Sequence, residues 1–381
     1  MNRRDLTRIF IRFYTRTYGW FHPIEKKVLF LSFSGKQYSD NPRAISEKLH
    51  ELYPDYKIVW KLPNAEDPYG VVPSYVERVK PGKYAFYREL ATSFGFVNNN
   101  ANSYGYFKRR GQCFIQTWHG DRGFKRILYE AGQRNDNSVL EPYTDLAVCG
   151  SRLGRETYHT AFRYDGEIYS GGCPRNDILV MPDPQKARLV RERLGVSAEQ
   201  KLFLFAPTYR DHVAEQNVEV DLASTVRALK EKYGGDWICL VRAHPGSGGL
   251  DLSGCSWALH VTDYPDMADL LLVSDFLITD YSSSAFDYYL TGRPCICALF
   301  DYDDYVAQDR GFKVRPEDSG IPIARDQQEL EKIIREYSDE DYQAAYQKVT
   351  EVYGTTESGA ASEQICRYIQ ERWDKRVSGK K

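Results

Sequence analysis

Short apolar runs that alternate with helical segments are the feature that most limits how this chain can fold. Turn residues bound each run, as expected for strands. Near-continuous apolar strands separated by helices are typical of parallel sheets buried on both faces. We therefore expect an α/β protein with two doubly wound domains facing a central cleft. The first series of runs is 28–33, 56–60, 94–99, 112–118 and 145–150, and the second is 201–207, 236–245, 257–262, 275–280 and 294–300.

A polar segment punctuated by prolines, residues 181–200, separates the two series. We accordingly expect a first domain over 27–195 and a second over 196–355. The tail is helical, and its last part, 356–381, could return to brace the first domain. Residues 1–26 precede the first strand as a separate segment.

Charge and cysteine content exclude several classes of protein. Lys and Arg number 51 against 53 Asp and Glu, and a net charge of -2 argues against a nucleic-acid-binding protein. The eight cysteines are spaced singly with no CxxC pair, which excludes zinc ribbons and thioredoxin-type sites. No apolar stretch approaches the length of a membrane span, and no signal-peptide pattern occurs. We therefore expect a reduced, cytoplasmic protein.

The first twenty residues predict a basic amphipathic helix. Arginines recur at every fourth position from Arg4 to Arg16, an apolar stripe runs from Leu6 to Tyr14, and Trp20 follows. This pattern suits an anionic membrane surface contacted through residues 1–21. It equally suits a helix that packs its apolar face on a domain and leaves the arginines in solvent.

Four polar segments each follow a predicted strand, where ligands bind in open α/β sheets. In the first, residues 116–126, His119 can act as a general base toward a substrate hydroxyl. Arg122, Lys125 and Arg126 lie just beyond and would attract a phosphate. The alternative is a surface loop in which His119 caps a local group.

The other three segments carry groups that suit phosphate oxygens. Hydroxyls, guanidinium groups and the amino end of a helix all donate hydrogen bonds to such oxygens. A plain strand end or a serine cap is the structural alternative for each. The residues are Thr208 and Arg210 after the first strand, Arg242 and His244 after the second, and Thr279, Asp280 and the serines 282–284 after the third.

Seven motifs carry a family resemblance: FSGKQYSDNPRAI (33–45), WHG (118–120), GGCPRNDIL (171–179), APTYRD (206–211), RAHP (242–245), SDFLITDYSSSAFDY (274–288) and RGFKV (310–314). In this order they resemble the CDP-glycerol glycerophosphotransferase family of teichoic-acid and capsule polyol-phosphate transferases. The resemblance runs from about residue 27 to 370. It implies a GT-B-type fold of two Rossmann-like domains, with an acceptor-binding first domain and a CDP-donor-binding second domain.

The resemblance also implies roles for single residues and a place in the cell. His119 would be the catalytic base, and His244 would contact the donor phosphates. The acceptor in this family is usually lipid-linked, which implies a peripheral protein on the inner face of the cell membrane. Donor-binding residues would be Thr208, Arg210, Arg242, Thr279, Asp280, Tyr281, Ser282, Ser283 and Arg310, and acceptor-side residues would be Gly120, Asp121, Arg122 and Lys125.

The chain departs from the family after its WHG motif. Family members typically continue with Thr-Pro, whereas Asp121 and Arg122 follow here. This change puts an acid and a base where acceptor or donor would bind. An alternative is that Asp121 orients His119 and raises its basicity.

The resemblance implies transfer of a polyol phosphate from a CDP-alditol to a glycan or lipid-linked hydroxyl, with release of CMP. Catalysis would depend on positioning and electrostatics, with no cofactor and no required metal. The acidic run 301–304 is interpreted as a turn from strand to helix and not as a metal site. A GT-B glycosyltransferase and a non-catalytic glycan-binding relative are the alternatives. Glycerol or ribitol, primase or polymerase, teichoic acid or capsule, and the oligomeric state all stay open.

Overall fold

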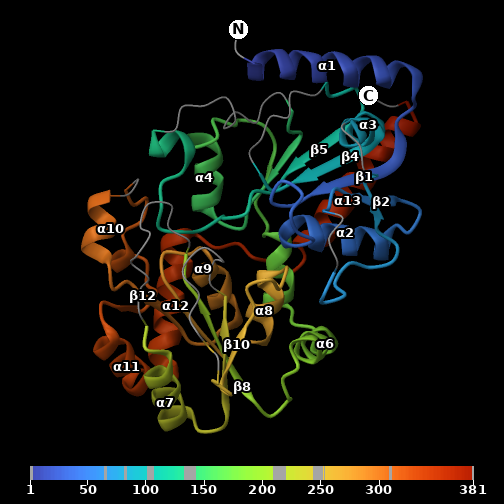
Figure 1. Cartoon of the computed structure of the whole chain (residues 1–381). Helices are drawn as coiled ribbons and strands as arrows, with labels where there is room; N and C mark the ends of the chain where they lie inside the picture. Colours follow the sequence, from blue (N-terminus) through green and yellow to red (C-terminus); the bar gives the residue numbers. More distant parts are fainter. Residues whose placement is uncertain are drawn as a thin grey trace. The chain divides into compact units, whose positions relative to one another are not determined.

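The computed structural model describes residues 3–63, 67–80, 84–100, 107–132, 143–208, 220–242, 252, 254–308 and 311–379. These residues form two compact units, each with its own parallel sheet (Figure 1). Unit 1 comprises Met1–Asp121, Leu128–Asp177 and Thr356–Lys381, and unit 2 comprises Arg122–Ile127 and Ile178–Thr355.

Unit 1 is built on a seven-stranded sheet in the order β3-β2-β1-β4-β5-β6-β7, and every neighbouring pair is parallel. The central strands are buried along almost their whole length, because helices cover the sheet. The strands are β1 (Glu25–Leu31), β2 (Lys57–Trp60), β3 (Glu77–Arg78), β4 (Ser93–Asn98), β5 (Cys113–Gln116), β6 (Leu146–Val148) and β7 (Ile168–Tyr169).

The helices of unit 1 come from both ends of the chain. Helix α1 (Arg3–Phe21) packs on α3 (Ala85–Thr92), and its Ile11 joins a buried cluster with Leu29, Phe96 and Phe114. Helix α13 (Ala361–Val377) packs on α2 (Asp40–Leu52). Figure 1 shows α13 beside strands built from the first hundred residues. The remaining helical segments are η1 (Leu128–Ala131), α4 (Arg152–Thr160) and η3 (Pro174–Asn176), and α5 (Asp177–Val180) spans the boundary between the units.

Unit 2 is built on a six-stranded parallel sheet in the order β10-β9-β8-β11-β12-β13. Apolar residues of the central strands, such as Phe203 and Ile278, pack with Leu229 and Leu330 from flanking helices. The strands are β8 (Lys201–Ala206), β9 (Trp237–Val241), β10 (Ala258–His260), β11 (Phe276–Thr279), β12 (Cys295–Ala298) and β13 (Ile323–Ala324). The helices are α6 (Pro184–Leu194), α7 (Leu222–Tyr233), α8 (Met267–Val273), α9 (Ser284–Tyr288), η4 (Tyr289–Thr291), α10 (Tyr302–Gln308), η5 (Pro316–Asp318), α11 (Gln327–Glu336) and α12 (Asp339–Tyr353).

The ten apolar runs all contain strands of the two sheets, so the prediction of an α/β, doubly wound fold is confirmed. The acidic run 301–304 follows β12 as predicted, but only Asp301 lies in the turn, and the other three residues begin α10. Seven cysteines are buried, Cys255 is half-buried, and all eight are free thiols.

The unit boundaries differ from the expected domain limits in two places. The main boundary falls after Asp177 and not after residue 195, because α6 packs on α8 of unit 2. Residues Arg122–Ile127 also belong to unit 2, although the chain on both sides of them belongs to unit 1.

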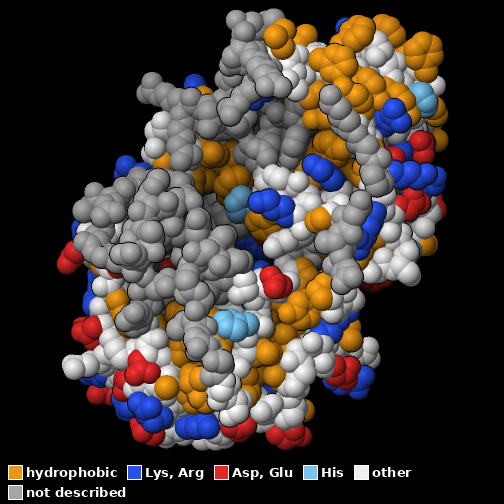
Figure 2. Space-filling view, in the orientation of Figure 1, with side chains coloured by type: hydrophobic (Ala, Val, Ile, Leu, Met, Phe, Trp, Pro, Cys, Tyr) orange, Lys and Arg blue, Asp and Glu red, His pale blue; other side chains and the backbone are white. Residues whose placement is uncertain are grey.

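Helix α1 turns an apolar face outward. Ile11 and Thr15 are buried against unit 1, whereas Phe13 and Trp20 are 65% and 68% exposed. Leu6, Ile9, Phe10 and Phe21 are exposed as well, and hydrophobic side chains gather over this helix in Figure 2. The alternative in which α1 packs its apolar stripe on the domain is therefore wrong for most of that stripe. No described helix is both long enough and apolar enough to cross a membrane.

Candidate functional site

His119 lies just past the carboxyl end of β5, at the edge of the unit 1 sheet where ligands bind in this fold class. Its Nδ1 is 2.8 Å from the backbone oxygen of Asn99. A carbonyl oxygen only accepts hydrogen bonds, so Nδ1 carries the proton and Nε2 keeps its lone pair. This tautomer is the one that can take a proton from a substrate hydroxyl.

The surroundings of His119 keep its ring neutral. Burial lowers the pKa of the imidazole below its ordinary value of 6.5, and the nearby Arg175 guanidinium acts in the same direction. The hydrogen bond to Asn99 and the charge of Asp40 oppose this shift without cancelling it. At neutral pH the ring is therefore a base and not an acid.

Three consecutive asparagines at the end of β4, Asn98 to Asn100, fix the backbone around the histidine. The Asn99 side chain accepts from the Phe33 N–H at 2.9 Å and donates to Ser32 Oγ at 3.1 Å. The Asn98 side chain donates from Nδ2 to the Asn100 carbonyl and accepts from the Asn100 N–H at Oδ1. The loops after β1 and β4 are thus joined at the edge of the sheet that carries His119.

Unusual backbone geometry gathers at the same edge. Four of the six described non-glycine residues with positive φ lie here: Phe33, Ser34, Asp40 and Trp118. Such conformations cost on the order of 1–3 kcal/mol each and persist where the surrounding structure enforces them. Asn41 enforces the one at Trp118, because its Nδ2 donates to the Trp118 carbonyl at 3.0 Å. His119 is therefore held by a strained, hydrogen-bonded loop.

Asp121 does not orient His119, contrary to the alternative raised by the sequence. The histidine nitrogen bonds Asn99, and the acidic charge acting on it is that of Asp40. Asp121 instead packs on the first turn of α4, where a Cβ on Gly154 would lie 1.7 Å from its Oδ1. Gly120 lies between the two residues in the same loop of unit 1.

One group among the described residues has ligand atoms close enough to hold a metal ion: Asp121, Cys173 and Glu357, within 4.8 Å of one another. Both Glu357 oxygens already accept hydrogen bonds, from the Cys173 N–H at 2.9 Å and from Asn176 Nδ2 at 2.8 Å. These bonds fasten the segment before α13 to the loop after β7. They give Glu357 a structural role.

In unit 2, Thr208, Thr279 and Asp280 meet where β8 and β11 end. The Thr208 N–H lies 2.9 and 3.0 Å from the two Asp280 oxygens, and its hydroxyl also donates to Asp280. Thr279 Oγ1 donates to the Ala206 carbonyl at 2.6 Å. Thr279 and Asp280 are each 1% exposed, so their side chains hold the loop after β8 in place.

The serine loop, residues 282–284, leads into a short helix. Helix α9 spans Ser284–Tyr288 and continues as a 3-10 turn. Ser282 Oγ accepts from the Ser284 N–H at 3.2 Å, while Ser283 makes no capping hydrogen bond through its side chain. Ser282 and Ser283 are half-buried, so their hydroxyls lie near the surface of the loop.

Tyr281 belongs to an aromatic cluster beside this loop. Its ring stacks on Tyr305 with centroids 3.6 Å apart, and Phe312 lies next to both. The Lys125 ammonium lies 5.0 Å from the Tyr305 ring centroid, a cation–π contact. The backbones of Lys125 and Phe312 also form an isolated antiparallel β-bridge. Lys125, expected on the acceptor side, therefore lies in unit 2 beside the serine loop.

Arg122 is also fixed in unit 2, in a buried ion pair. Its Nη2 lies 3.2 Å from Asp287 Oδ1 on α9, and the two side chains are 0% and 10% exposed. The neighbouring Phe124 packs on Phe286 of the same helix. Arg122 therefore anchors the 122–127 segment to α9, which differs from the expected acceptor-side contact.

Arg242 lies at the end of β9 and donates from Nη1 to the Tyr264 carbonyl at 2.8 Å. Together with Thr208 and the serine loop it places three of the predicted phosphate-binding segments at the carboxyl edge of the unit 2 sheet. The remaining predicted site residues, Arg210, His244 and Arg310, lie outside the described residues.

Sequence reasoning did not select Asn99, Asn41 or Arg175. Asn99 sets the tautomer of His119, and Arg175 helps to set its charge state. The run of three asparagines at 98–100, where the predicted strand 94–99 ends, was the available signal, since such side chains bond to nearby backbone in place of regular structure.

Comparison with known proteins agrees with the family resemblance of the sequence. A model of the CDP-Glycerol:Poly(glycerophosphate) glycerophosphotransferase family matches residues 14–371. A teichoic acid poly(glycerol phosphate) polymerase of Staphylococcus epidermidis is 32% identical over 367 residues, which cover 89% of this chain and 50% of that protein. A teichoic acid glycerol-phosphate transferase of Staphylococcus aureus is 27% identical over 370 residues, which cover 91% of this chain and 93% of that protein. The chain spans about half the length of the poly(glycerol phosphate) polymerases of S. epidermidis and Bacillus subtilis that it matches.

The fold agrees with a solved structure of the wall teichoic acid polymerase TagF, determined with its H444N variant and CDPG. The TM-score is 0.81 at 29% identity, and the match covers 97% of this chain and 95% of that one. The two parallel-sheet units and this match confirm the prediction of a GT-B-type architecture. Neither the family description nor the names of these relatives indicates a cofactor.

Proposed function

The chain belongs to the CDP-glycerol:poly(glycerophosphate) glycerophosphotransferase family, and on that premise we propose that it transfers a polyol phosphate from a CDP-alditol to an acceptor hydroxyl. The observation that carries this proposal is the fixed tautomer of His119, which leaves Nε2 able to accept a proton. The relatives reported above are named for glycerol phosphate, which supports glycerol as the alditol. The acceptor would be a glycan or a lipid-linked precursor in teichoic acid biosynthesis.

The proposed reaction has one proton transfer and one phosphoryl transfer. Nε2 of His119 takes the proton of the acceptor hydroxyl, and the hydroxyl oxygen bonds to the β-phosphorus of the donor. The bond from the β-phosphorus to the bridging oxygen breaks, and CMP leaves with that oxygen and its electron pair. Phosphoryl transfer of this kind depends mainly on positioning and electrostatic stabilisation.

Unit 2 would supply that stabilisation. We assign donor binding to Arg242, to the hydroxyls of Ser282 and Ser283, and to Thr208, because they share the carboxyl edge of one sheet. Thr279 and Asp280 would act as positioning residues, since their side chains bond the end of β8. Arg210, His244, Tyr281 and Arg310 remain proposed donor contacts, as the motifs imply. Gly120 and Asp121 remain proposed on the acceptor side.

Helix α1 would place the protein on the inner face of the cell membrane. Phe13, Trp20 and Phe21 expose their rings, and arginines lie among them on the helix. Amphipathic helices with this composition bury the apolar face at the boundary of headgroups and acyl chains. A lipid-linked acceptor would meet the enzyme at that surface.

The direct test is CMP release from CDP-glycerol in the presence of a glycerol-phosphate-primed acceptor. We expect CMP to form in step with acceptor extension, and CDP-glycerol at ~100 times its Kd to raise the free energy of unfolding by about 2.7 kcal/mol. CDP-ribitol, UDP-glucose and UDP-N-acetylglucosamine serve as matched ligands. Stabilisation by a UDP-sugar alone, with release of a nucleoside diphosphate, would replace the proposal with a glycosyltransferase. Binding of donor without any turnover would indicate a non-catalytic relative.

The pH dependence follows from the charge state of His119. The base must be unprotonated, and burial lowers its pKa below 6.5, so the ring stays active below the pH at which an ordinary histidine is half protonated. We expect the acid limb of kcat/KM to have its midpoint below pH 6.5. A midpoint above 6.5 would contradict this assignment.

A further inference from the structure

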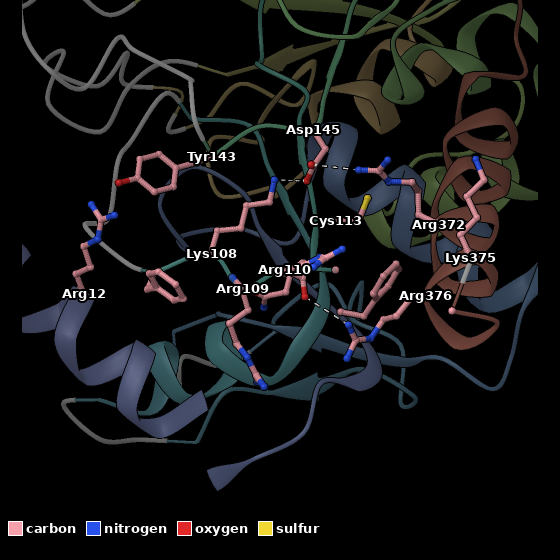
Figure 3. A pocket seen from close by; sticks show the side chains of 15 residues that line it. Arg12, Lys108, Arg109, Arg110, Cys113, Tyr143, Asp145, Arg372, Lys375 and Arg376 are labelled. Atoms are coloured by element: carbon pink, nitrogen blue, oxygen red, sulfur yellow. Dashed lines mark hydrogen bonds and ion pairs between the residues drawn. The ribbon is translucent and has the colours of Figure 1, made fainter. Parts of the chain in front are cut away.

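A basic pocket lies in unit 1 at the amino ends of β4, β5 and β6, the sheet edge opposite to His119 (Figure 3). Its volume is about 810 Å³. Seven basic side chains line it, and Asp145 is the acidic one among the described residues that do so. The basic residues are Arg12 from α1, Lys108, Arg109 and Arg110 from the turn before β5, and Arg372, Lys375 and Arg376 from α13.

Asp145 neutralises two of these cations. Lys108 Nζ lies 2.5 Å and Arg372 Nη2 lies 3.2 Å from its oxygens, and Figure 3 shows both approaching the carboxylate. The Phe114 N–H also donates to it at 2.7 Å. Arg12, Arg110 and Lys375 form no ion pair with any described residue, so the pocket keeps a large excess of positive charge.

Neighbouring backbone holds the pocket walls in place. Arg109 donates from Nη1 to the carbonyls of His22 and Ala91, each at 2.9 Å, and its side chain packs on Gly19 of α1. Gly111 closes the turn before β5 with φ +84°, and a Cβ there would lie 2.3 Å from Arg376 Nη1. The glycine thus leaves space for a guanidinium at the pocket wall. The basic side chains come from three separate elements, so a single helix end does not explain them.

Packing several cations together has an electrostatic cost that a bound anion would remove. Burial and the adjacent Arg376 charge both lower the pKa of Arg109, which shows that the positive charges act on one another. Guanidinium groups bind phosphate oxygens in a fork with two parallel hydrogen bonds, and lysine adds a compact positive charge. The chemistry that fits this pocket is a phosphate ester.

We propose that this pocket binds the phosphate group of an anionic lipid headgroup. The choice of a lipid comes from α1, because Arg12 lines the pocket while Ile9 and Phe13, three residues before it and one after, are exposed. The apolar face and the basic pocket therefore adjoin on one helix. The choice of lipid rests on the membrane contact proposed above, whereas the phosphate chemistry rests on the pocket alone. The site is separate from the donor and acceptor contacts.

The test uses the full chain and vesicles of two compositions, phosphatidylcholine alone and phosphatidylcholine with phosphatidylglycerol. The variant is Arg12→Gln with Lys375→Gln. Neither side chain forms an ion pair with a described residue, so the changes should leave the fold intact. The matched control is Arg227→Gln with Lys332→Gln on helices of unit 2, which removes the same charge. Phe13→Ser with Trp20→Ser tests the membrane contact independently. A soluble source of the anion is tested by adding inorganic phosphate and measuring the shift of the thermal unfolding midpoint.

We expect the pocket variant to lose about thirtyfold in binding to the anionic vesicles, since each basic residue near such a surface contributes about fivefold. Its binding to phosphatidylcholine should not change, and the control variant should stay within about twofold of the wild type on both. Phe13→Ser with Trp20→Ser should lower binding to both compositions. Inorganic phosphate could stabilise the wild type but not the pocket variant while neither protein binds vesicles. That result would support a phosphate site and overturn the proposal that its ligand is a lipid.

Equal losses in the pocket and control variants would show a net-charge effect and overturn the site. A pocket variant that matches the wild type with both vesicles and phosphate would overturn it as well. Neither result depends on CMP release, so failure of the pocket and failure of the proposed transferase reaction are distinguishable. The thermal unfolding midpoint of each variant confirms that it is folded.

Discussion

His119→Ala is expected to lower kcat for CMP release by about 10²–10⁴-fold, the range that a positioned general base contributes. The donor contacts that we propose lie in unit 2, whereas His119 lies in unit 1. Thermal stabilisation by CDP-glycerol should therefore be unchanged in this variant. The combination of lost turnover and kept donor binding identifies a group that acts on the acceptor hydroxyl.

His159→Ala is the matched control for this variant. His159 is an exposed histidine on α4 of the same unit, and its Nδ1 lies 2.8 Å from Asp165 Oδ1. We expect it to keep wild-type kcat. A loss of less than about threefold in His119→Ala would remove the catalytic assignment, because such a loss lies far below the contribution of a general base.

Asp287→Ala is expected to lower the free energy of unfolding by about 3–5 kcal/mol, because it leaves the Arg122 guanidinium buried without its ion-pair partner. The Arg122 side chain is fully buried, so water cannot replace the lost carboxylate. Urea unfolding measures the change. Glu156→Gln provides the control, since it removes a partner of Arg152 from an exposed i,i+4 pair and should cost about 0.5 kcal/mol or less.

The double variant Arg122→Met with Asp287→Leu separates a structural role from a catalytic one. Replacing both partners of a buried pair by apolar side chains is often close to neutral for stability. We expect the double variant to recover most of the stability lost in Asp287→Ala and to keep CMP release. A stable double variant without turnover would show instead that Arg122 contacts a substrate.

The sequence predicted the sheets well because their strands are buried on both faces. A short apolar run between two helical segments, such as 201–207, is typical of a buried strand, and β8 spans Lys201–Ala206. The strands β3, β7 and β13 were missed, since each is two residues long and has no periodicity to detect.

The site was predictable in its position but not in its contacts. His119 was identified from its place after a strand, whereas its hydrogen bond to Asn99 joins residues twenty apart and depends on the pairing of β4 with β5. The assignment of residues 122–127 to unit 2 was not foreseen, because the contacts of Arg122 and Phe124 with α9 leave no signal in the composition of the segment. Tertiary contacts decide both features.

Unit 1 is assembled from segments that are far apart in the sequence, and this has a consequence for synthesis on the ribosome. Helix α2 appears early, but α13, which packs on it, is made only after every residue of unit 2. Domains fold as they emerge from the ribosome when their chain is continuous. Here the apolar side of α2 has no partner from α13 until translation has passed residue 377, so unit 2 can complete its fold before unit 1.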